Sequence, residues 1–228
     1  MHMKKYLRVL LSSLLVLSPN AFSSTNLNNS TADIVSLRTQ CGTTPDCAES
    51  MHDLLAWIWN TKIPNASAPL LVNIGPGTFS VVNPTTGAGE VFCNGGGFVT
   101  FRGAGRGTTT LTGPGRGIKV GAVTTEGASV KITNCNQLAF EDMTIKGELD
   151  LENNAYAVGW EGGGSSTWSN MELIAAYYPW VDVCATGSNA IGTHTWFGST
   201  FISNGQGVLN VGYKSNCGIS EIHGSNIF

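Results

Sequence analysis

Large apolar residues return at nearly regular intervals in the second half of the chain, each time within a six-residue pattern. Each copy has a large apolar residue at its first and last positions, a small or polar residue third, and Met, Ser or Thr fourth. The copies occupy residues 140–145, 168–173, 197–202 and 222–227, and their first residues lie 28, 29 and 25 positions apart. Repeats of this length indicate stacked units that bury their apolar faces against one another.

Within a copy, the first and last residues are expected to point to one side and the second and fifth to the other. This odd spacing requires a bend near the third residue. The second positions are Glu141, Ser169, Gly198 and His223, and the fifth positions are Thr144, Glu172, Phe201 and Asn226. We expect coils of 22–30 residues with two or three strands each, and about six coils between residues 70 and 228.

The first half of the chain predicts one helix followed by short strands. Residues 45–60 read as a helix that Thr44 caps and Pro45 begins. Its apolar face would be formed by Met51, Leu54, Leu55 and Ile58. Strands are expected at residues 70–74, 78–82, 98–101, 108–111 and 130–133, with Gly-rich turns between them.

The ends of such a stack expose unpaired strand edges. The helix at 45–60 is placed to cover the first edge, whereas the sequence stops at Phe228 immediately after a repeat. Two explanations stay open. The chain is a C-terminally truncated form of a longer solenoid, or its last coil associates with another chain through the open edge.

Residues 1–23 have the features of a secretory signal peptide. Lys4, Lys5 and Arg8 precede a short apolar run, and small residues ending at Ser23 suit cleavage. An uncleaved anchor is the alternative. No later segment reaches the ~20 apolar residues of a membrane span. We therefore expect a secreted, periplasmic or surface protein with a polar segment at 24–44 and a folded domain at 45–228.

The charge and the cysteine content limit the classes of binding partner and indicate the cellular compartment. The mature chain would carry nine basic against 15 acidic side chains, which argues against nucleic acid. Cys41 and Cys47 bracket a short loop and are expected to form a disulfide in an oxidising compartment. Cys93, Cys135 and Cys217 precede strands and are expected to fill interior positions. No spacing of Cys or His indicates a metal site.

Candidate chemistry lies on the outward positions of the repeats. Glu141 and Glu172 fall on neighbouring coils, and a pair of carboxylates is what glycoside hydrolysis requires. The alternative is that both are solvated glutamates on a sheet face. Asp182 is a third acidic candidate. Lys146 is a candidate for binding a uronate carboxylate, although a surface charge is the simpler interpretation.

An aromatic segment supplies the candidate sugar contacts. Tyr177, Tyr178 and Trp180 precede Asp182, and aromatic rings stack on the apolar faces of sugars. These rings could instead close a hydrophobic loop over the coil. The Gly-rich segments at 103–107 and 113–117 lack the Gly-Lys-Ser/Thr ending of a phosphate loop, so they read as turns, with Arg102, Arg106 and Arg116 forming at most a weak anion patch.

The order of these elements resembles the pectin lyase superfamily. The resemblance covers about residues 45–228 and includes the helix, the strand at 70–74, the Gly75-Pro76-Gly77-Thr78-Phe79 turn and the segments at 98–103 and 108–111. It implies an all-β fold, a right-handed parallel β-helix with a short N-terminal capping α-helix. Because this superfamily includes lyases, hydrolases, esterases, tailspikes and adhesins, the fold alone does not define an activity.

The catalytic motifs of the best-known superfamily enzymes are missing. The sequence lacks the Gln-Asp-Thr and Asp-Phe-Ile-Phe-Gly motifs of pectinesterases, and it lacks the Asn-Thr-Asp motif of polygalacturonases. We expect no cofactor and a polysaccharide or cell-surface glycan as partner. Three hypotheses remain. They are a polysaccharide lyase or glycoside hydrolase, a non-catalytic adhesin-type β-helix, and a truncated inactive product.

Overall fold

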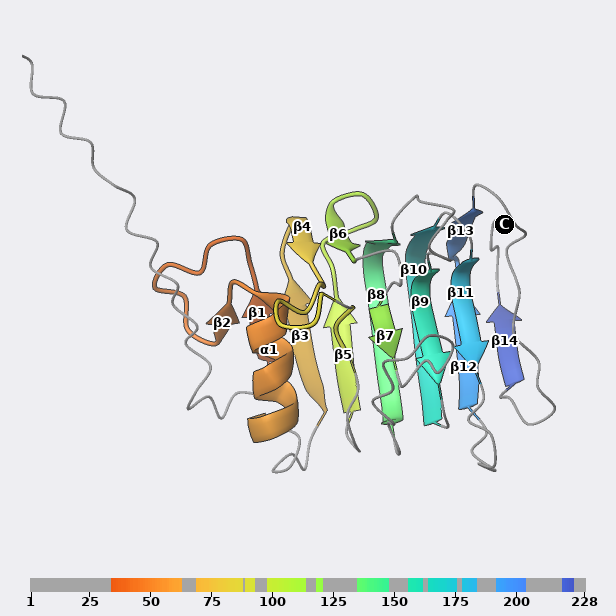
Figure 1. Ribbon diagram of the computed structural model, residues 1–228, viewed down its shortest axis with the longest axis horizontal. Coiled ribbons are helices and arrows are strands. Elements are labelled where there is room, and N and C mark those ends of the chain that lie inside the picture. Colours follow the sequence, from red (N-terminus) through yellow and green to blue (C-terminus); the bar gives the residue numbers. More distant parts are fainter. Residues whose placement is uncertain are drawn as a thin grey trace, which may run out of the picture.

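The computed structural model describes the chain from residue 34 to residue 223 with gaps (Figure 1). The described ranges are 34–62, 69–87, 89–92, 98–113, 118–120, 135–147, 156–161, 164–175, 178–183, 192–203 and 219–223. In chain order the elements are β1 (Ile34–Leu37), β2 (Cys47–Ala48), α1 (Met51–Trp57), the π-helical turn η1 (Ile58–Lys62), β3 (Leu70–Ile74), β4 (Gly77–Ser80), β5 (Phe98–Arg102), β6 (Thr109–Thr112), β7 (Ile118–Val120), β8 (Cys135–Lys146), β9 (Tyr156–Glu161), β10 (Gly164–Ala175), β11 (Tyr178–Val183), β12 (Gly192–Phe197), β13 (Thr200–Ser203) and β14 (Ile219–His223).

The named strands form three parallel columns, which we call faces one, two and three. Face one contains β2, β1, β3, β5, the first half of β8 and of β10, β12 and β14. Face two contains β4, β6, the second half of β8 and of β10, and β13. Face three contains β7, β9 and β11. Because the chain visits the faces in turn and every named strand pair is parallel, the fold is a parallel β-helix, as the sequence predicts.

One interior column on face one holds the coils together. Its buried members lie in direct register on successive strands: Val35, Val72, Phe101, Phe140, Trp168 and Trp196, and Ile222 takes the next position of this register. The rings of Phe101 and Phe140 stack with centroids 5.1 Å apart, and those of Trp168 and Trp196 with centroids 4.9 Å apart. Six of these rungs follow residue 70, so the expected number of coils is confirmed.

The bend inside each repeat is a left-handed backbone position. Asp142, Asn170 and Gly198 have φ angles of 56°, 52° and 54°, and each lies between the halves of the repeat that belong to faces one and two. Asn, Asp and Gly are the residues that adopt this conformation at least cost. The Asn170 amide also donates to Asp142 Oδ1 at 2.7 Å, which links two adjacent bends.

The third repeat begins one residue earlier than the sequence pattern suggested. Trp196, not Phe197, lies opposite Trp168, and Gly198, not Ser199, takes the left-handed position. Trp196 is 2% exposed, whereas Phe197 is 43% exposed. Both residues are large and apolar, so spacing alone did not separate them. The conformational freedom of glycine fixes the register instead.

The N-terminal part contains a coil that the sequence analysis missed. The segment expected to be a polar N-terminal stretch includes β1, whose Val35 and Leu37 are fully buried. β1 pairs with β3 in parallel, so it adds a rung before the first expected strand. The helix is also shorter than the expected 45–60. α1 begins after Ser50, whose Oγ accepts from Asp53 N, so Thr44 is not its cap.

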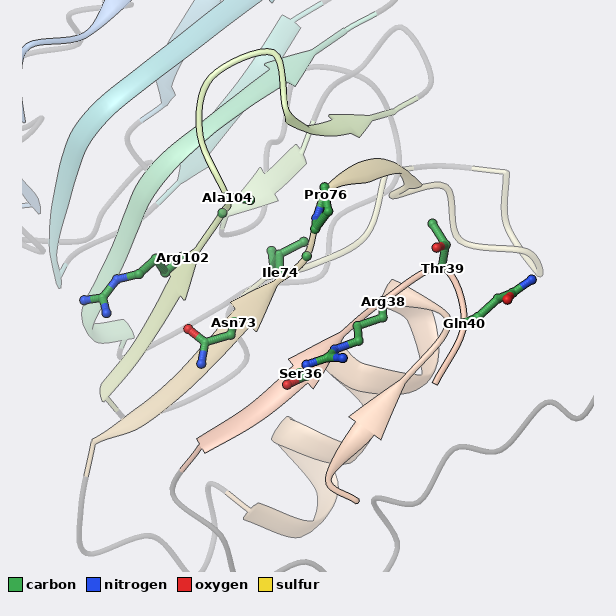
Figure 2. A pocket seen from close by; sticks show the side chains of 11 residues that line it. Ser36, Arg38, Thr39, Gln40, Asn73, Ile74, Pro76, Arg102 and Ala104 are labelled. Atoms are coloured by element: carbon green, nitrogen blue, oxygen red, sulfur yellow. The ribbon is translucent and has the colours of Figure 1, made fainter. Parts of the chain in front are cut away.

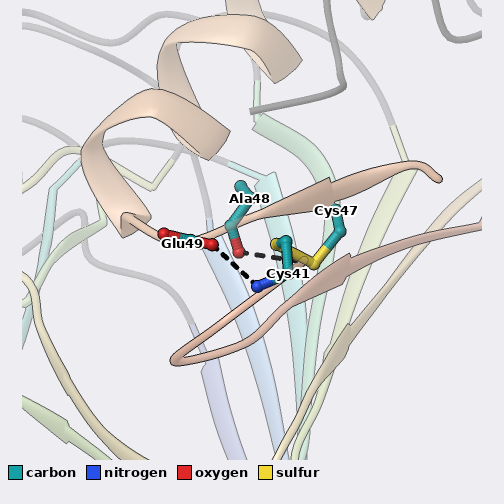
Figure 3. Close-up of a disulfide and its surroundings, with 4 residues drawn as sticks. All are labelled: Cys41, Cys47, Ala48 and Glu49. Carbon is teal, nitrogen blue, oxygen red and sulfur yellow. Dashed lines mark hydrogen bonds between the residues drawn. A yellow bond between two sulfur atoms is a disulfide. The ribbon is translucent and has the colours of Figure 1, made fainter. Parts of the chain in front are cut away.

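A disulfide explains why the helix starts late. Cys41 and Cys47 are joined as expected, and Cys47 lies in β2, which pairs with β1 (Figure 3). This pairing holds Cys47 and Ala48, shortly before Ser50, in an extended conformation. Glu49 Oε1 accepts from Cys41 N at 2.8 Å. The expected apolar face of the helix is confirmed, since Met51, Leu54, Leu55 and Ile58 are all buried.

Several expectations fall outside the described residues. They concern the strand at 130–133, the side chains of Cys93, Cys135 and Cys217, and the end of the last coil. Self-association through that end therefore stays a prediction. Among the described residues, no helix combines the length and apolar character needed to cross a membrane.

Candidate functional site

An outward column of mostly polar residues runs along face one, one position after the interior column. Ser36 lies opposite Asn73, and the column continues in register on the following strands through Arg102, Glu141, Ser169 and Phe197, with position 223 next in the backbone register. Neighbouring strands are ~4.8 Å apart, so these positions form a closely spaced ladder. We call this set the outer ladder.

A groove opens on the outer ladder where β1, β3 and β5 meet. Its volume is about 520 Å³, and its lining includes Ser36, Arg38, Asn73 and Arg102. Figure 2 shows that Arg38 extends along β1 toward Ser36, with Asn73 and Arg102 on the next two strands. With Thr39 and Gln40, which also line it, the groove has two guanidinium groups, two amides and two hydroxyls.

An ion pair fixes one of these guanidinium groups. Arg102 Nε donates to Glu141 Oε2 at 2.7 Å, between side chains that are 47% and 28% exposed. The pair joins the groove to the next rung of the outer ladder. Because Nε is the donor in this bond, the terminal amino groups of Arg102 can donate to a ligand.

The expected carboxylate pair does not come together. Glu141 lies opposite Ser169 on face one, whereas Glu172 lies opposite Thr144 on face two. The left-handed bend at Asn170 separates the two positions. Neither glutamate lines the groove.

Glu172 instead takes part in a hydrogen-bond chain on face two. Thr144 Oγ1 donates to Glu172 Oε2 at 2.9 Å and accepts from Gly107 N at 2.9 Å. Arg106, in the same loop as Gly107, donates to Thr200 Oγ1 at 2.8 Å. Since Glu172 and Thr200 lie in register, the 103–107 loop is fastened across several coils.

The aromatic segment is divided between the interior and undescribed positions. Trp180 is buried, and its ring lies edge-on to Trp168 and Trp196, with centroids 5.2 Å and 4.9 Å away. It therefore contributes to the core rather than to a sugar-binding surface. Tyr177 and the side chain of Tyr178 lie outside the described part.

Two other candidates are also remote from the groove. Asp182 lies opposite Trp160 on face three, and its side chain is outside the described part. Lys146 ends β8 on face two and is exposed. In the part of the chain that the structure describes, no group of three His, Cys, Asp or Glu side chains could hold a metal ion.

Sequence reasoning missed Arg38 and Asn73. Arg38 lies in the segment assigned to a polar terminus, and Asn73 was treated only as part of a strand. The alternation of buried Val35 and Leu37 with outward Ser36 was the available signal, since period-two burial is typical of a strand.

No protein-family model and no curated protein match the chain. Solved structures that are similar to it include three that each share 10% sequence identity with it. The first is pectin methylesterase PemA from Erwinia chrysanthemi, with a TM-score of 0.43; the match covers 74% of this chain and 55% of that enzyme. The others are a pectin methylesterase in complex with hexasaccharide VII and a mutant pectin methylesterase in complex with hexasaccharide IV. Their TM-scores are 0.41 and 0.43, and both matches cover 82% of this chain and 70% of the other.

Proposed function

We propose that this protein is an exported carbohydrate-binding β-helix whose groove on face one binds a glycan bearing carboxylates. The observation that carries the proposal is the presence of Arg38 and Arg102 in one groove with Asn73 and Ser36. Guanidinium groups form paired hydrogen bonds with carboxylates, and amides and hydroxyls bind sugar hydroxyls.

The dimensions of the groove suit a short stretch of a polymer. Three strands at ~4.8 Å separation span roughly 10 Å, the length of about two sugar units. The outer ladder continues from the groove to Ser169 and the exposed Phe197, so a longer chain has polar and aromatic contacts further along face one.

Charge favours a discrete acidic ligand over a nucleic acid. The whole chain carries 12 basic and 15 acidic side chains, so the two arginines form a local positive site on a protein of negative net charge. A polyanion as dense as nucleic acid requires an extended basic surface. A glycan with spaced carboxylates does not.

Binding is better supported than cleavage. Hydrolysis by paired carboxylates requires one protonated acid and one base or nucleophile facing the same bond. Glu141 is held in an ion pair with Arg102, and Glu172 lies beyond a bend on another face. A non-catalytic role, one of the alternatives from the sequence, is therefore the function that we propose.

Titration calorimetry with carboxylated oligosaccharides tests this function. The matched ligands are the same oligosaccharides with each carboxylate reduced to a hydroxymethyl group. We expect the acidic ligands to bind and the reduced ones to bind at least about tenfold more weakly, since charge-assisted hydrogen bonds contribute about 1.5–3 kcal/mol. Binding should also weaken as salt increases.

The protein variants are Arg38→Gln, Arg102→Gln and, as a matched control, Arg106→Gln, whose side chain does not line the groove and donates to Thr200 on face two. The first two should lose about tenfold or more in affinity, and the control should bind like the wild type. Equal losses in all three variants, or equal affinity for acidic and reduced ligands, would contradict the proposal. Release of new reducing ends in the same mixtures would show that the protein is an enzyme.

Export is the second component of the proposal. It is supported by the signal-like features of residues 1–23 and by the Cys41–Cys47 disulfide, which is favoured in oxidising compartments. Sequencing the amino terminus of the protein from the culture medium or periplasm should find Ser24 first. Intact protein retained in the reducing cytosol would contradict export.

A further inference from the structure

A second pocket adjoins the groove and is lined by His52, which pairs with the buried carboxylate of Glu90 behind it. His52 Nδ1 lies 2.6 Å from Glu90 Oε1, between side chains that are 37% and 8% exposed. The second oxygen of Glu90 accepts from Asn83 Nδ2 at 3.4 Å. Because a carboxylate accepts hydrogen bonds, this contact places a proton on Nδ1 and leaves Nε2 as the ring nitrogen that can act as a base.

His52 lines a pocket of about 360 Å³ together with Ser50 and Ser80. Ser50 Oγ accepts from Asp53 N, and Ser80 Oγ accepts from Val82 N. In both cases the backbone N–H is the donor, so each hydroxyl hydrogen can be donated elsewhere. The pocket thus combines a base with two hydroxyl donors.

The charge of the pocket selects for a neutral ligand. Glu49 is among its lining residues, and no Lys or Arg is. The Glu49 carboxylate accepts from Cys41 N, which holds it in place beside the disulfide (Figure 3). An anionic ligand would therefore be repelled. The side chains of Phe79 and Val82 provide apolar contacts for a small organic group.

We propose that this pocket is a hydrolytic site for small neutral carboxylic esters, with His52 as general base and Glu90 as its positioning residue. His52 Nε2 removes a proton from a water molecule while the water oxygen bonds to the ester carbonyl carbon. The hydroxyls of Ser50 and Ser80 donate to the resulting oxyanion. The tetrahedral intermediate then expels the alkoxide, which takes the proton from the His52 imidazolium, so ester and water give acid and alcohol.

The site is separate from the proposed glycan groove. Arg38 and Arg102 line the groove and not the pocket, and His52 lines the pocket and not the groove. Thr39 lines both and marks their boundary. The two functions can therefore fail or succeed independently.

Hydrolysis of p-nitrophenyl acetate by the full chain tests the proposal. Wild-type protein should exceed the second-order rate of free 4-methylimidazole by about 100-fold, a typical contribution of general acid–base catalysis. An ester whose acyl chain ends in a carboxylate should be hydrolysed more slowly. A wild-type rate no higher than that of 4-methylimidazole overturns the proposal.

The variants separate catalysis from folding. His52→Gln can still donate to Glu90 but has no base, and it should reduce the rate to background while circular dichroism stays native. Asp53→Asn is the matched control, because this exposed neighbour does not line the pocket, and it should keep the wild-type rate. Retention of the rate in His52→Gln overturns the proposal.

Glu90 requires a readout that a structural role would not change. Glu90→Gln should lower kcat at least tenfold with KM nearly unchanged. In ¹⁵N spectra the wild type should show His52 protonated at Nδ1, and Glu90→Gln should show a mixture of tautomers. An unchanged kcat, or a wild-type His52 protonated at Nε2, overturns the assigned role of Glu90.

Discussion

The indole of Trp168 stacks on the ring of Phe140 with centroids 4.4 Å apart and planes 8° from parallel. The two residues are 28 positions apart in sequence and lie in direct register on β10 and β8. Trp168 also stacks on Trp196 on the next coil. One side chain thus joins three successive coils.

Trp168→Ala should therefore be among the most damaging substitutions in the chain. It removes a fully buried ring and its stacking partners on both sides, and we expect a loss of about 3–5 kcal/mol in the free energy of unfolding. Urea denaturation followed by circular dichroism measures the loss. A loss below about 1 kcal/mol would show that the stacked rings of the interior column contribute little to the stability of the core.

The register of the third repeat can be tested with two adjacent alanines. Trp196→Ala should cost about 3–5 kcal/mol because its ring is buried, whereas Phe197→Ala should cost less than about 1 kcal/mol because its ring faces outward. The same denaturation experiment compares them. A larger loss for Phe197→Ala would place the repeat one residue later.

The left-handed position of Gly198 predicts which side chains it accepts. Gly198→Asn should change stability by less than about 1 kcal/mol, since Asn170 has the same conformation in the preceding coil. Gly198→Val should cost about 1–2 kcal/mol more than Gly198→Asn, because a β-branched residue is disfavoured at positive φ. A Cβ at Gly198 would meet no atom within 4 Å, so a difference in stability between the two variants reflects backbone strain and not a steric clash. Differential scanning calorimetry measures the melting temperature of each variant. Equal melting temperatures for the two variants would argue against the bend.

A buried polar chain stabilises the interior of the C-terminal coils. Trp168 Nε1 donates to Ser166 Oγ at 2.7 Å, and Ser166 Oγ lies 2.7 Å from His194 Nδ1. The serine hydroxyl therefore accepts from the indole N–H and shares a second hydrogen bond with the histidine ring. Ser166→Ala should cost about 1–3 kcal/mol by leaving buried polar atoms without this partner. Thermal melting measures it, and Ser169→Ala on the outward side of the same strand is the control that should melt like the wild type.

The short disulfide loop should stabilise the first coil. Replacing Cys41 and Cys47 together by Ser should lower the free energy of unfolding by about 2 kcal/mol, as expected for a loop closed over six residues. Protection of β1 amides from hydrogen exchange should fall first, since β1 pairs with β2. Unchanged exchange in β1 would mean that the strand is held by β3 alone.

The periodic part of the sequence predicted the coil architecture well. Phe140, Trp168 and Ile222 occupy rungs of one register, and the expected strand at 70–74 is β3 (Leu70–Ile74). Side chains that repeat once per coil report directly on the core, because each must pack against the same position in the next coil. The spacing cannot decide between adjacent apolar residues such as Trp196 and Phe197, because both are large, apolar and about one coil away from Trp168.

The candidate sites were less predictable because they depend on which face each residue occupies. The bend at Asn170 moved Glu172 to a different face from Glu141, and the burial of Trp180 removed it from the surface. Arg38 could not be connected with Arg102 until β1 was placed beside β3. Long-range strand pairing, which the local pattern does not specify, made that connection.

The interior column increases in size from Val35 and Val72 through Phe101 and Phe140 to Trp168 and Trp196, before Ile222 takes the last position. Each layer is therefore fitted to the width of its two neighbours. Copying a valine layer into a late position would leave a void beside tryptophan. Copying a tryptophan layer into an early position would overfill the space beside valine. Duplication or deletion of a whole layer is consequently compatible with the fold only where the layers that become neighbours have interior side chains of similar size.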